Sequence, residues 1–237
     1  APDNVIAKLS MFSGVKEKAI VLLPNAKTIY EVPLTLENRG IGKELVERLG
    51  LSRPRVNLSP WKKLINKTMN EQAPTVNVGV VAKYLNNKDT YMSVFEALTA
   101  AAWSHDYQVN IKWIDAEHIT EKNIKSKLKG VDGIVVPGGF GLRGLEGKII
   151  AAQYALRHKV PYIGLCLGLQ MAVVAAARNA GLKKANSIEL DPLTPDPVVH
   201  IMEDQKSITD MGGTMRLGNY ECRLQPGTLA KEVYGSN

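Results

Sequence analysis

The stretch Val160-Pro161-Tyr162-Ile163-Gly164-Leu165-Cys166-Leu167-Gly168 places a short apolar run directly before a cysteine flanked by glycines. The stretch Gln170–Arg178 that follows is rich in helix-forming residues. A small–x–nucleophile–x–small pattern between a strand and a helix is the layout of a nucleophile elbow. The glycines allow a sharp turn, and the positive end of the following helix favours a thiolate. The pattern therefore predicts that Cys166 is an exposed nucleophile, although a lone cysteine is more often buried in a core.

From Thr75 onward, short apolar runs alternate with stretches of helical spacing. The expected strands are Val76–Val81, Val109–Ile114, Asp132–Val136 and Val160–Gly164. The expected helices are Tyr91–Trp103, Thr120–Leu128, Leu145–Arg157 and Gln170–Arg178. Continuous apolar strands separated by helices predict an α/β fold with a doubly wound, mostly parallel sheet. The site of such a sheet lies beyond the carboxyl ends of its strands, where both Gly138-Gly139 and Cys166 fall.

The residues before Thr75 do not show this alternation of apolar runs and helical spacing. Two short apolar runs, Ile6–Phe12 and Ala19–Leu23, are expected to be strands. Helical spacing of apolar residues predicts one helix over Leu36–Leu49, ending at Gly50, and a further helix over Trp61–Met69. The composition becomes polar near residues 70–74, which predicts two domains, 1–72 and 73–237.

The bulk composition restricts the class of protein. A chain of 237 residues with 45% apolar content can bury a full core, and no run approaches the length of a membrane span. The net charge of +7 would suit an anionic partner, but the basic residues are scattered and no nucleic-acid-binding motif accompanies them. Two cysteines are too few for a disulfide framework, which favours a reduced, cytoplasmic setting. The chain begins without methionine, and we expect it to be a piece of a longer protein.

A thiolate that attacks an amide or ester carbonyl generates an oxyanion, which needs hydrogen-bond donors aimed at it. Gly138-Gly139 directly follows an expected strand and could turn a backbone N–H toward such a charge. The N–H of Leu167, just past the nucleophile, would be the second donor. On its own, the Pro137-Gly138-Gly139 string would indicate an ordinary tight turn; its pairing with the elbow favours an oxyanion hole.

The nucleophile also requires a base, which is usually a histidine. His105 and His118 lie in or beside expected helical surface, and His158 lies in the last turn of a helix, where a positive charge is favourable. His200 lies in an apolar run, 198–202, that is expected to be a strand, where a histidine is more often a satisfied core or edge residue than a base. The sequence therefore contains a nucleophile, Cys166, but no convincing histidine base.

Several strings together resemble one family. They are Asp89–Leu98, Val136–Gly147, Gly164–Gln170, Ala185–Glu189 and Gly212–Gly218. The segment from Thr75 resembles the glutaminase domain of the class I, triad-type glutamine amidotransferases, which implies a flavodoxin-like fold, and more closely the CTP synthases. Lys8–Phe12 and Thr28–Leu34 resemble the end of the synthase, or amidoligase, domain that precedes the glutaminase in that family.

The resemblance implies roles for individual residues. Cys166 would form a glutamyl thioester and release ammonia, and Arg143 and Glu146 would belong to a lid through which GTP activates hydrolysis. Without the resemblance, these last two would be interpreted as a solvent-exposed ion pair, and Glu189 as an ordinary surface glutamate. Gly139 and Leu167 would form the oxyanion hole. The glutamine-binding residues would be Gly139, Leu167, Gly168, Leu169, Gln170 and Glu189, the last pairing with the α-amino group.

The resemblance also implies substrates and cofactors. Glutamine, UTP and ATP would be the small-molecule substrates, with magnesium at a synthase site largely outside this chain and GTP as an allosteric activator. No metal ligands are expected within the chain itself, and neither a nucleic acid nor a membrane is expected as a partner. The protein would be a homo-oligomer, a tetramer by the resemblance.

Departures from the family pattern leave alternatives open. The family's His-Pro-Glu string and an arginine-rich segment that binds the substrate carboxylate are not found, and Ala82-Lys83-Tyr84 stands where Gly-Lys-Tyr is usual. Asn25-Ala26 stands where an aspartate-containing segment is expected. We therefore expect this polypeptide alone to be inactive. The alternatives are a glutaminase serving another synthetase and a catalytically dead binding or assembly domain. A stand-alone cysteine hydrolase is less favoured, because such enzymes often place histidine where Leu167 stands.

Overall fold

The computed structural model describes residues 4–52, 56–85, 87–202, 205 and 221–235. Its strands are β1 (Thr75–Ala82), β2 (Gln108–Asp115), β3 (Gly133–Val136), β4 (Tyr162–Gly164), β5 (Ala185–Ser187) and β6 (Asp196–Val199). Its α-helices are α1 (Asn4–Ser13), α2 (Val32–Asn38), α3 (Ile41–Arg48), α4 (Ser59–Thr68), α5 (Met92–Ser104), α6 (Ile124–Lys127), α7 (Leu145–His158), α8 (Leu167–Asn179) and α9 (Leu229–Tyr234). Short 3₁₀ helices cover Glu17–Ala19, Ile29–Glu31, Lys88–Tyr91 and Ala116–His118. The string Gly212–Gly218 lies outside the described residues.

The main sheet has the strand order β2-β1-β3-β4, and all its neighbouring pairs are parallel. Strand β1 pairs with β2 over its whole length, from Thr75 opposite Gln108 to Ala82 opposite Asp115. The chain moves from β1 outward to β2, then crosses back to β3 and β4, as in the flavodoxin-like arrangement. The predicted doubly wound α/β sheet is therefore confirmed.

Alternate residues of the central strands face two different helical layers. Val78, Val80 and Ala82 of β1 and Val135 of β3 lie in one buried cluster, against which α5 packs. Val81, Ile134 and Val136 lie in another cluster, with residues of α6 and α7. A third cluster joins α7 to α8. Because side chains alternate across a strand, one apolar run supplies both faces of the sheet.

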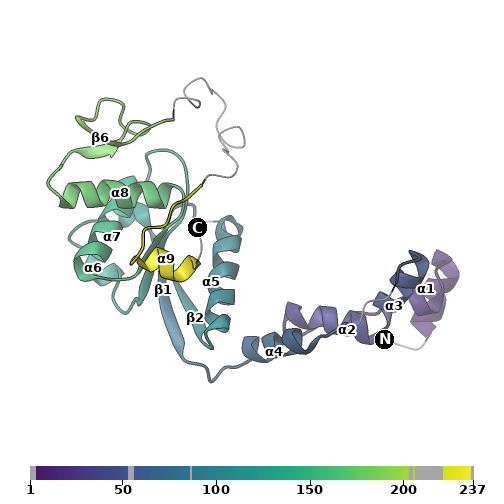
Figure 1. Ribbon diagram of the computed structural model, residues 1–237. Helices are drawn as coiled ribbons and strands as arrows, with labels where there is room; N and C mark the ends of the chain where they lie inside the picture. Colours follow the sequence, from purple (N-terminus) through teal and green to yellow (C-terminus); the bar gives the residue numbers. More distant parts are fainter. Residues whose placement is uncertain (1–3, 53–55, 86, 203–204, 206–220, 236–237) are drawn as a thin grey trace.

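The first helices form an arm that extends away from the sheet, with α4 nearest to it (Figure 1). Tyr30 joins this arm to α5: its hydroxyl donates to Glu96 Oε2 at 3.1 Å, and its ring meets that of Trp103 edge-on at 5.2 Å. Trp61 of α4 donates its indole N–H to the Tyr30 carbonyl at 2.8 Å. Aromatic and hydrogen-bonding contacts thus join the arm to the sheet domain.

Two expected strands in the arm are wrong. Ile6–Phe12 lies within helix α1, because Val5, Leu9 and Phe12 recur at helical spacing. Ala19–Leu23 begins at the end of a 3₁₀ helix and has no strand partner among the described residues. Apolar runs of this length do not by themselves distinguish a strand from a helix.

Two expected helices are also shorter than the spacing suggested. Leu36–Leu49 is divided into α2 and α3 by Gly40, whose φ of 80° ends the first helix in the left-handed region. In Thr120–Leu128 only α6 is α-helical. The side chain of Asn123 accepts from the Thr120 N–H and donates to the His118 carbonyl, which holds the preceding residues in a turn.

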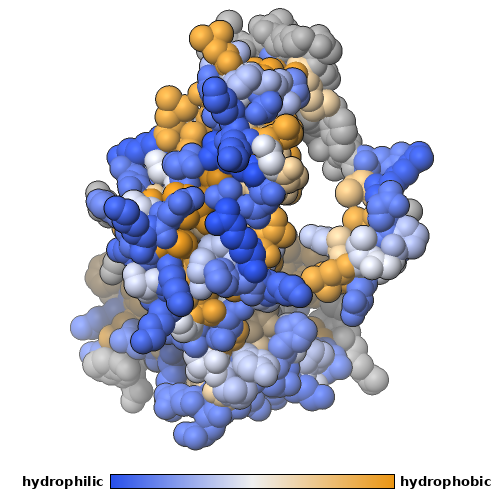
Figure 2. Space-filling model, turned by 90° about the vertical axis from the view of Figure 1, so that its left-hand side faces the viewer, coloured by the Kyte–Doolittle hydropathy of each residue, from blue (hydrophilic) through white to orange (hydrophobic). Residues whose placement is uncertain are grey.

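The surface over α6, α7 and α8 is mostly hydrophilic, with apolar residues interspersed among charged ones (Figure 2). No helix in the described part of the chain is both long enough and apolar enough to cross a bilayer.

Candidate active site

Cys166 stands at the junction of β4 and α8, as the elbow pattern predicts. Its backbone has φ 52° and ψ −112°, which is a sparsely populated conformation for a residue with a side chain. Such strain costs on the order of 1–3 kcal/mol and persists where the surrounding structure imposes it. The side chain is exposed and forms no disulfide. The elbow therefore presents a free thiol at the carboxyl end of the sheet.

The two elbow glycines are required by close packing of backbone on backbone. A Cβ on Gly164 would lie 2.5 Å from the carbonyl carbon of Gly168, and a Cβ on Gly168 would overlap the carbonyl oxygen of Val136. The first turn of α8 thus rests directly on the ends of β3 and β4. Glycine is therefore required on both sides of the nucleophile for steric reasons, as the elbow pattern in the sequence predicts.

The turn that follows β3 lies beside the thiol. The Leu165 N–H donates to the Val136 carbonyl at 2.9 Å, which continues the pairing of β3 with β4 up to the elbow. A Cβ built on Gly138 would be 3.3 Å from the Cβ of Cys166 and 3.8 Å from its Sγ. Any larger side chain at position 138 would crowd the nucleophile. The predicted juxtaposition of Gly138-Gly139 with Cys166 is therefore present.

Leu167 supplies a backbone N–H directly after Cys166, and Gly139 follows the residue of the turn that meets the thiol. Leu167 is the first residue of α8, so its N–H is one of the four that no carbonyl of the helix accepts. Gly139 has φ 153°, and a Cβ there would come within 2.9 Å of Lys83 Cε. A thiol beside the N–H groups of a helix start can attack a carbonyl carbon while such a donor stabilises the resulting oxyanion.

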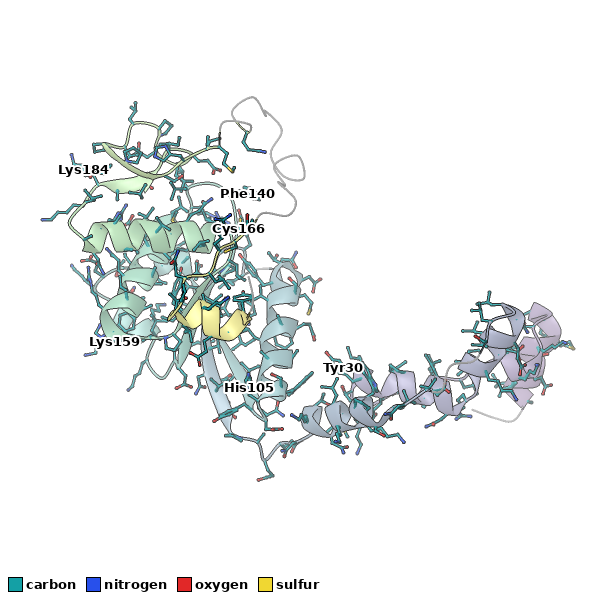
Figure 3. The ribbon with its side chains drawn as sticks, viewed as in Figure 1. Tyr30, His105, Phe140, Lys159, Cys166 and Lys184 are labelled. Carbon is teal, nitrogen blue, oxygen red and sulfur yellow. The ribbon has the colours of Figure 1, made fainter. Side chains whose placement is uncertain are left out.

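Two buried lysines lie beneath this turn, and the sequence reasoning missed both. Lys148 of α7 is 0% exposed and Lys83, which follows β1, is 1% exposed. Lys148 Nζ donates to the carbonyls of Pro137 at 2.9 Å and Gly138 at 3.4 Å. Lys83 Nζ donates to the carbonyl of Phe140, to that of Gly141 at 3.2 Å and to that of Arg143 at 3.4 Å. Figure 3 shows Phe140 and Cys166 at the same end of the sheet.

A signal for Lys148 was present in the sequence. Leu145, Lys148, Ile149 and Ala152 recur at i, i+3, i+4 and i+7, so Lys148 falls on the apolar face of its helix. Burial, followed by the positive charge of Lys83, lowers the pKa of Lys148 from 10.5 to about 8, while the charge of Cys166 acts in the opposite direction.

This shift predicts a pH dependence of stability. In the unfolded chain Lys148 keeps its proton up to about pH 10.4, whereas in the folded protein it loses it near pH 8. Over this window the unfolded state binds more protons, so the free energy of unfolding contributed by Lys148 rises with pH, by about 3 kcal/mol in total. Urea unfolding of the wild type and of Lys148→Met across the window should show the wild type gaining stability relative to the variant. A constant difference between the two proteins would contradict the shift.

The other predicted residues fall into two groups. Gly168, Leu169 and Gln170 lie in the first turn of α8 beside Cys166, and the N–H groups of Leu169 and Gln170 donate to the Cys166 carbonyl at 3.0 and 3.2 Å. Glu189 is exposed, follows β5, and donates its N–H to Ser187 Oγ at 3.3 Å. The structure brings the first group to the thiol, whereas no described contact joins Glu189 to it.

Arg143 and Glu146 do not pair with each other, so the alternative interpretation of the two as one solvent-exposed ion pair is not supported. Arg143 Nε lies 3.0 Å from Glu117 Oε1, and Glu146 Oε1 lies 2.7 Å from Arg178 Nη1. The separation has a backbone cause, because Gly144 has φ 72° and caps α7 between them. Each residue therefore joins the 143–146 segment to a different neighbour.

The histidines have other surroundings. His118 Nδ1 lies 3.0 Å from Asp115 Oδ2, and the ring of His158 lies against Tyr154 with centroids 4.3 Å apart. His105 lies near the opposite end of the domain from Cys166 (Figure 3). The expected strand over 198–202 ends at Val199, so His200 is an exposed residue whose Nε2 lies 3.3 Å from the Pro197 carbonyl. Within the described residues, no hydrogen bond links a histidine to Cys166.

A parallel sheet with a cysteine elbow at the start of a helix defines a class of α/β proteins equipped for covalent acyl chemistry. The profile of the class-I glutamine amidotransferases matches residues 87–236. The chain belongs to this family.

Relatives with curated descriptions are similar over almost the whole chain. The CTP synthase of Prochlorococcus marinus is 48% identical over 98% of the chain and 42% of its own length, and that of Bacillus subtilis is 44% identical over 96% and 42%. The chain thus spans about two fifths of the length of these relatives. Among solved structures, the glutaminase domain of Trypanosoma brucei CTPS with bound acivicin is similar at 38% identity and a TM-score of 0.52. That match covers 55% of this chain and 52% of the other.

Proposed function

We propose that the chain is the glutamine-hydrolysing part of a CTP synthase, which supplies ammonia for the ATP-dependent amination of UTP to CTP. The observation that carries the proposal is the exposed Cys166 thiol at a strained elbow beside the Gly138-Gly139 turn. It is supported by identities of 44% and 48% with CTP synthases.

The reaction begins when Cys166 Sγ, as a thiolate, attacks the side-chain amide carbon of glutamine. The N–H groups of Gly139 and Leu167 hold the oxyanion that forms. Collapse of the tetrahedral intermediate breaks the C–N bond, and the leaving nitrogen takes a proton and departs as ammonia. Water then attacks the glutamyl thioester, releasing glutamate and restoring the thiol. The protons require a base, which we expect from a His-Pro-Glu segment of the kind that the family resemblance implies, and not from the four histidines of this sequence.

Glutamine would be held on both sides of the thiol. Gly168, Leu169 and Gln170 line the first turn of α8, where backbone groups and the Gln170 amide can bind the substrate. Glu189 would neutralise the α-ammonium group, which needs a carboxylate when it is partly desolvated. Its exposed position after β5 leaves the carboxylate accessible for that role.

The surface around Arg143 has the chemistry for GTP as an activator. The guanidinium lies 5.3 Å from the centroid of the exposed Tyr84 ring, and the exposed Phe140 belongs to the same turn. Aromatic rings beside a cation suit a ligand that combines a base with phosphates. Glu146 would act with Arg143 in the lid, through its pairing with Arg178 on α8.

ATP, magnesium and UTP would bind elsewhere in the whole protein. Among the described residues, no group of three His, Cys, Asp or Glu side chains is placed to hold a metal ion, so no step of the reaction is assigned to magnesium here. We further propose that the protein acts in the cytoplasm as a homo-oligomer, a tetramer by family resemblance. The free state of Cys166 and Cys222 is consistent with a reducing compartment.

The proposal is tested by assaying the full-length protein for UTP-dependent amination with glutamine and, separately, with ammonium salt. Both nitrogen sources should support CTP formation. Glutamine hydrolysis without any use of UTP would instead indicate another synthetase partner. Absence of hydrolysis, together with no labelling of Cys166 by a glutamine-like electrophile, would indicate a binding or assembly domain.

A further inference from the structure

The turn from Pro137 to Arg143 is held from beneath by two ammonium groups. Together, Lys148 and Lys83 bind five of its carbonyl oxygens. The Lys148 contacts are the ones next to the thiol, because Gly138 is the residue that lies against Cys166. One side of this turn therefore faces the two buried ammonium groups, and its other side faces the exposed thiol of Cys166.

We propose that Lys148 is a positioning residue for the oxyanion-binding turn. By holding the Pro137 and Gly138 carbonyls toward the interior, it aims the Gly139 N–H outward. The peptide bond between Gly138 and Gly139 is trans and planar, so its N–H points opposite to its C=O. An ammonium group on the carbonyl oxygen also polarises the same peptide unit, which makes its N–H a stronger donor.

The burial of Lys148 costs free energy, which argues for a specific role of its ammonium group. Its ammonium is fully buried on the apolar face of α7, beside Leu145 and Ile149. It also lies in the first turn of that helix, where the dipole disfavours a positive charge. An apolar residue of similar length would avoid both costs. The two carbonyl contacts are what an apolar residue could not provide.

A competing explanation is that the charge of Lys148 acts on the thiolate directly. The two explanations differ in which reactions of Cys166 depend on the lysine. Aiming of the Gly139 N–H matters only where an oxyanion forms, whereas stabilisation of the thiolate affects every reaction of the sulfur. A reagent that forms an oxyanion and one that does not therefore distinguish them.

The experiment uses full-length protein and compares Lys148→Met with the wild type. L-Glutamate γ-semialdehyde adds to the thiol and forms a hemithioacetal oxyanion, and its inhibition constant is measured against glutamine hydrolysis or against labelling of Cys166. Iodoacetamide alkylates the same sulfur by direct displacement, without an oxyanion. Loss of one oxyanion donor costs about 10²–10³-fold in kcat. If Lys148→Met misaims the donor, we expect the aldehyde to bind about 10-fold or more weakly and kcat to fall by a similar factor. The KM for glutamine and the rate of alkylation by iodoacetamide should stay within about twofold of the wild type.

Lys159→Met is the matched control: Lys159 is exposed, caps the far end of the same helix and lies well away from Cys166 (Figure 3). It should behave as the wild type in every assay. Lys148→Gln keeps a neutral donor and should give an intermediate loss, and it also serves if the methionine variant does not fold.

Two results would overturn the inference, which rests on the proposed function. Unchanged aldehyde affinity in both Lys148 variants would show that the lysine does not aim the donor. Equal losses with the aldehyde and with iodoacetamide would show that it acts on the thiol or on the fold. Failure of the proposed function is distinguishable, because then the wild type itself would not bind the aldehyde at Cys166.

Discussion

Replacing Cys166 by alanine should abolish glutamine-dependent CTP formation by the full-length protein and leave ammonia-dependent formation within about twofold of the wild type. The nucleophile forms the covalent intermediate, so its loss should lower glutamine hydrolysis on the order of 10⁴-fold or more. Ammonium salt bypasses the thiol and supplies the same nitrogen to the second site. Parallel assays with the two nitrogen sources, at saturating UTP and ATP, measure both effects.

The matched control is Cys222→Ala, because Cys222 is also exposed and free but has no elbow around it. This variant should keep both activities. Glutamine-driven synthesis that survives in Cys166→Ala would refute the assignment of the nucleophile. Loss of both activities in Cys166→Ala would mean that the residue supports the fold or the coupling between sites.

Substitution of Gly168 by alanine should strongly lower the rate of glutamine hydrolysis by displacing the thiol, although Cys166 itself is unchanged. The added Cβ would overlap the Val136 carbonyl oxygen, so the first turn of α8 must move away from β3. The Leu167 N–H and the Cys166 side chain would move with it. A displacement of about 1 Å costs on the order of 10²-fold in rate, and overpacking of this kind costs typically 1–3 kcal/mol of stability. Glutaminase kinetics and thermal unfolding measure the two losses.

Gly133→Ala is the comparison, since a Cβ at that position of β3 would meet only Pro161, at 3.8 Å or more. It should leave hydrolysis near the wild-type rate. A Gly168→Ala variant with wild-type kcat and melting temperature would mean that α8 can shift freely, and that the elbow glycines are not sterically required.

The parts of the structure that sequence predicted well are those fixed by local backbone chemistry. Strand β3, its glycine turn and the elbow at Cys166 follow from short apolar runs and the residues that end them. Strand assignments failed in the arm, where Ile6–Phe12 is helical, because an isolated apolar run does not reveal whether a partner strand exists.

Contacts between distant segments were harder to foresee. The hydrogen bond from Lys83 to the Phe140 carbonyl forms because β1 and β3 are neighbours in the sheet. No local sequence pattern predicts such a contact. Lys148 was visible as a charged residue at an apolar position, but its partners were not. The separate ion pairs of Arg143 and Glu146 likewise depend on how Gly144 turns the chain between them.

The left-handed backbone at Cys166 sets a stability cost for any side chain at this position. Glycine would fit φ 52° without strain, so every side chain at position 166 is kept against a conformational preference. A chain with glycine at this position would fold with less strain and would have no thiol. The free energy that the cysteine side chain costs the fold is therefore the energetic counterpart of an exposed, reactive sulfur at the end of the sheet.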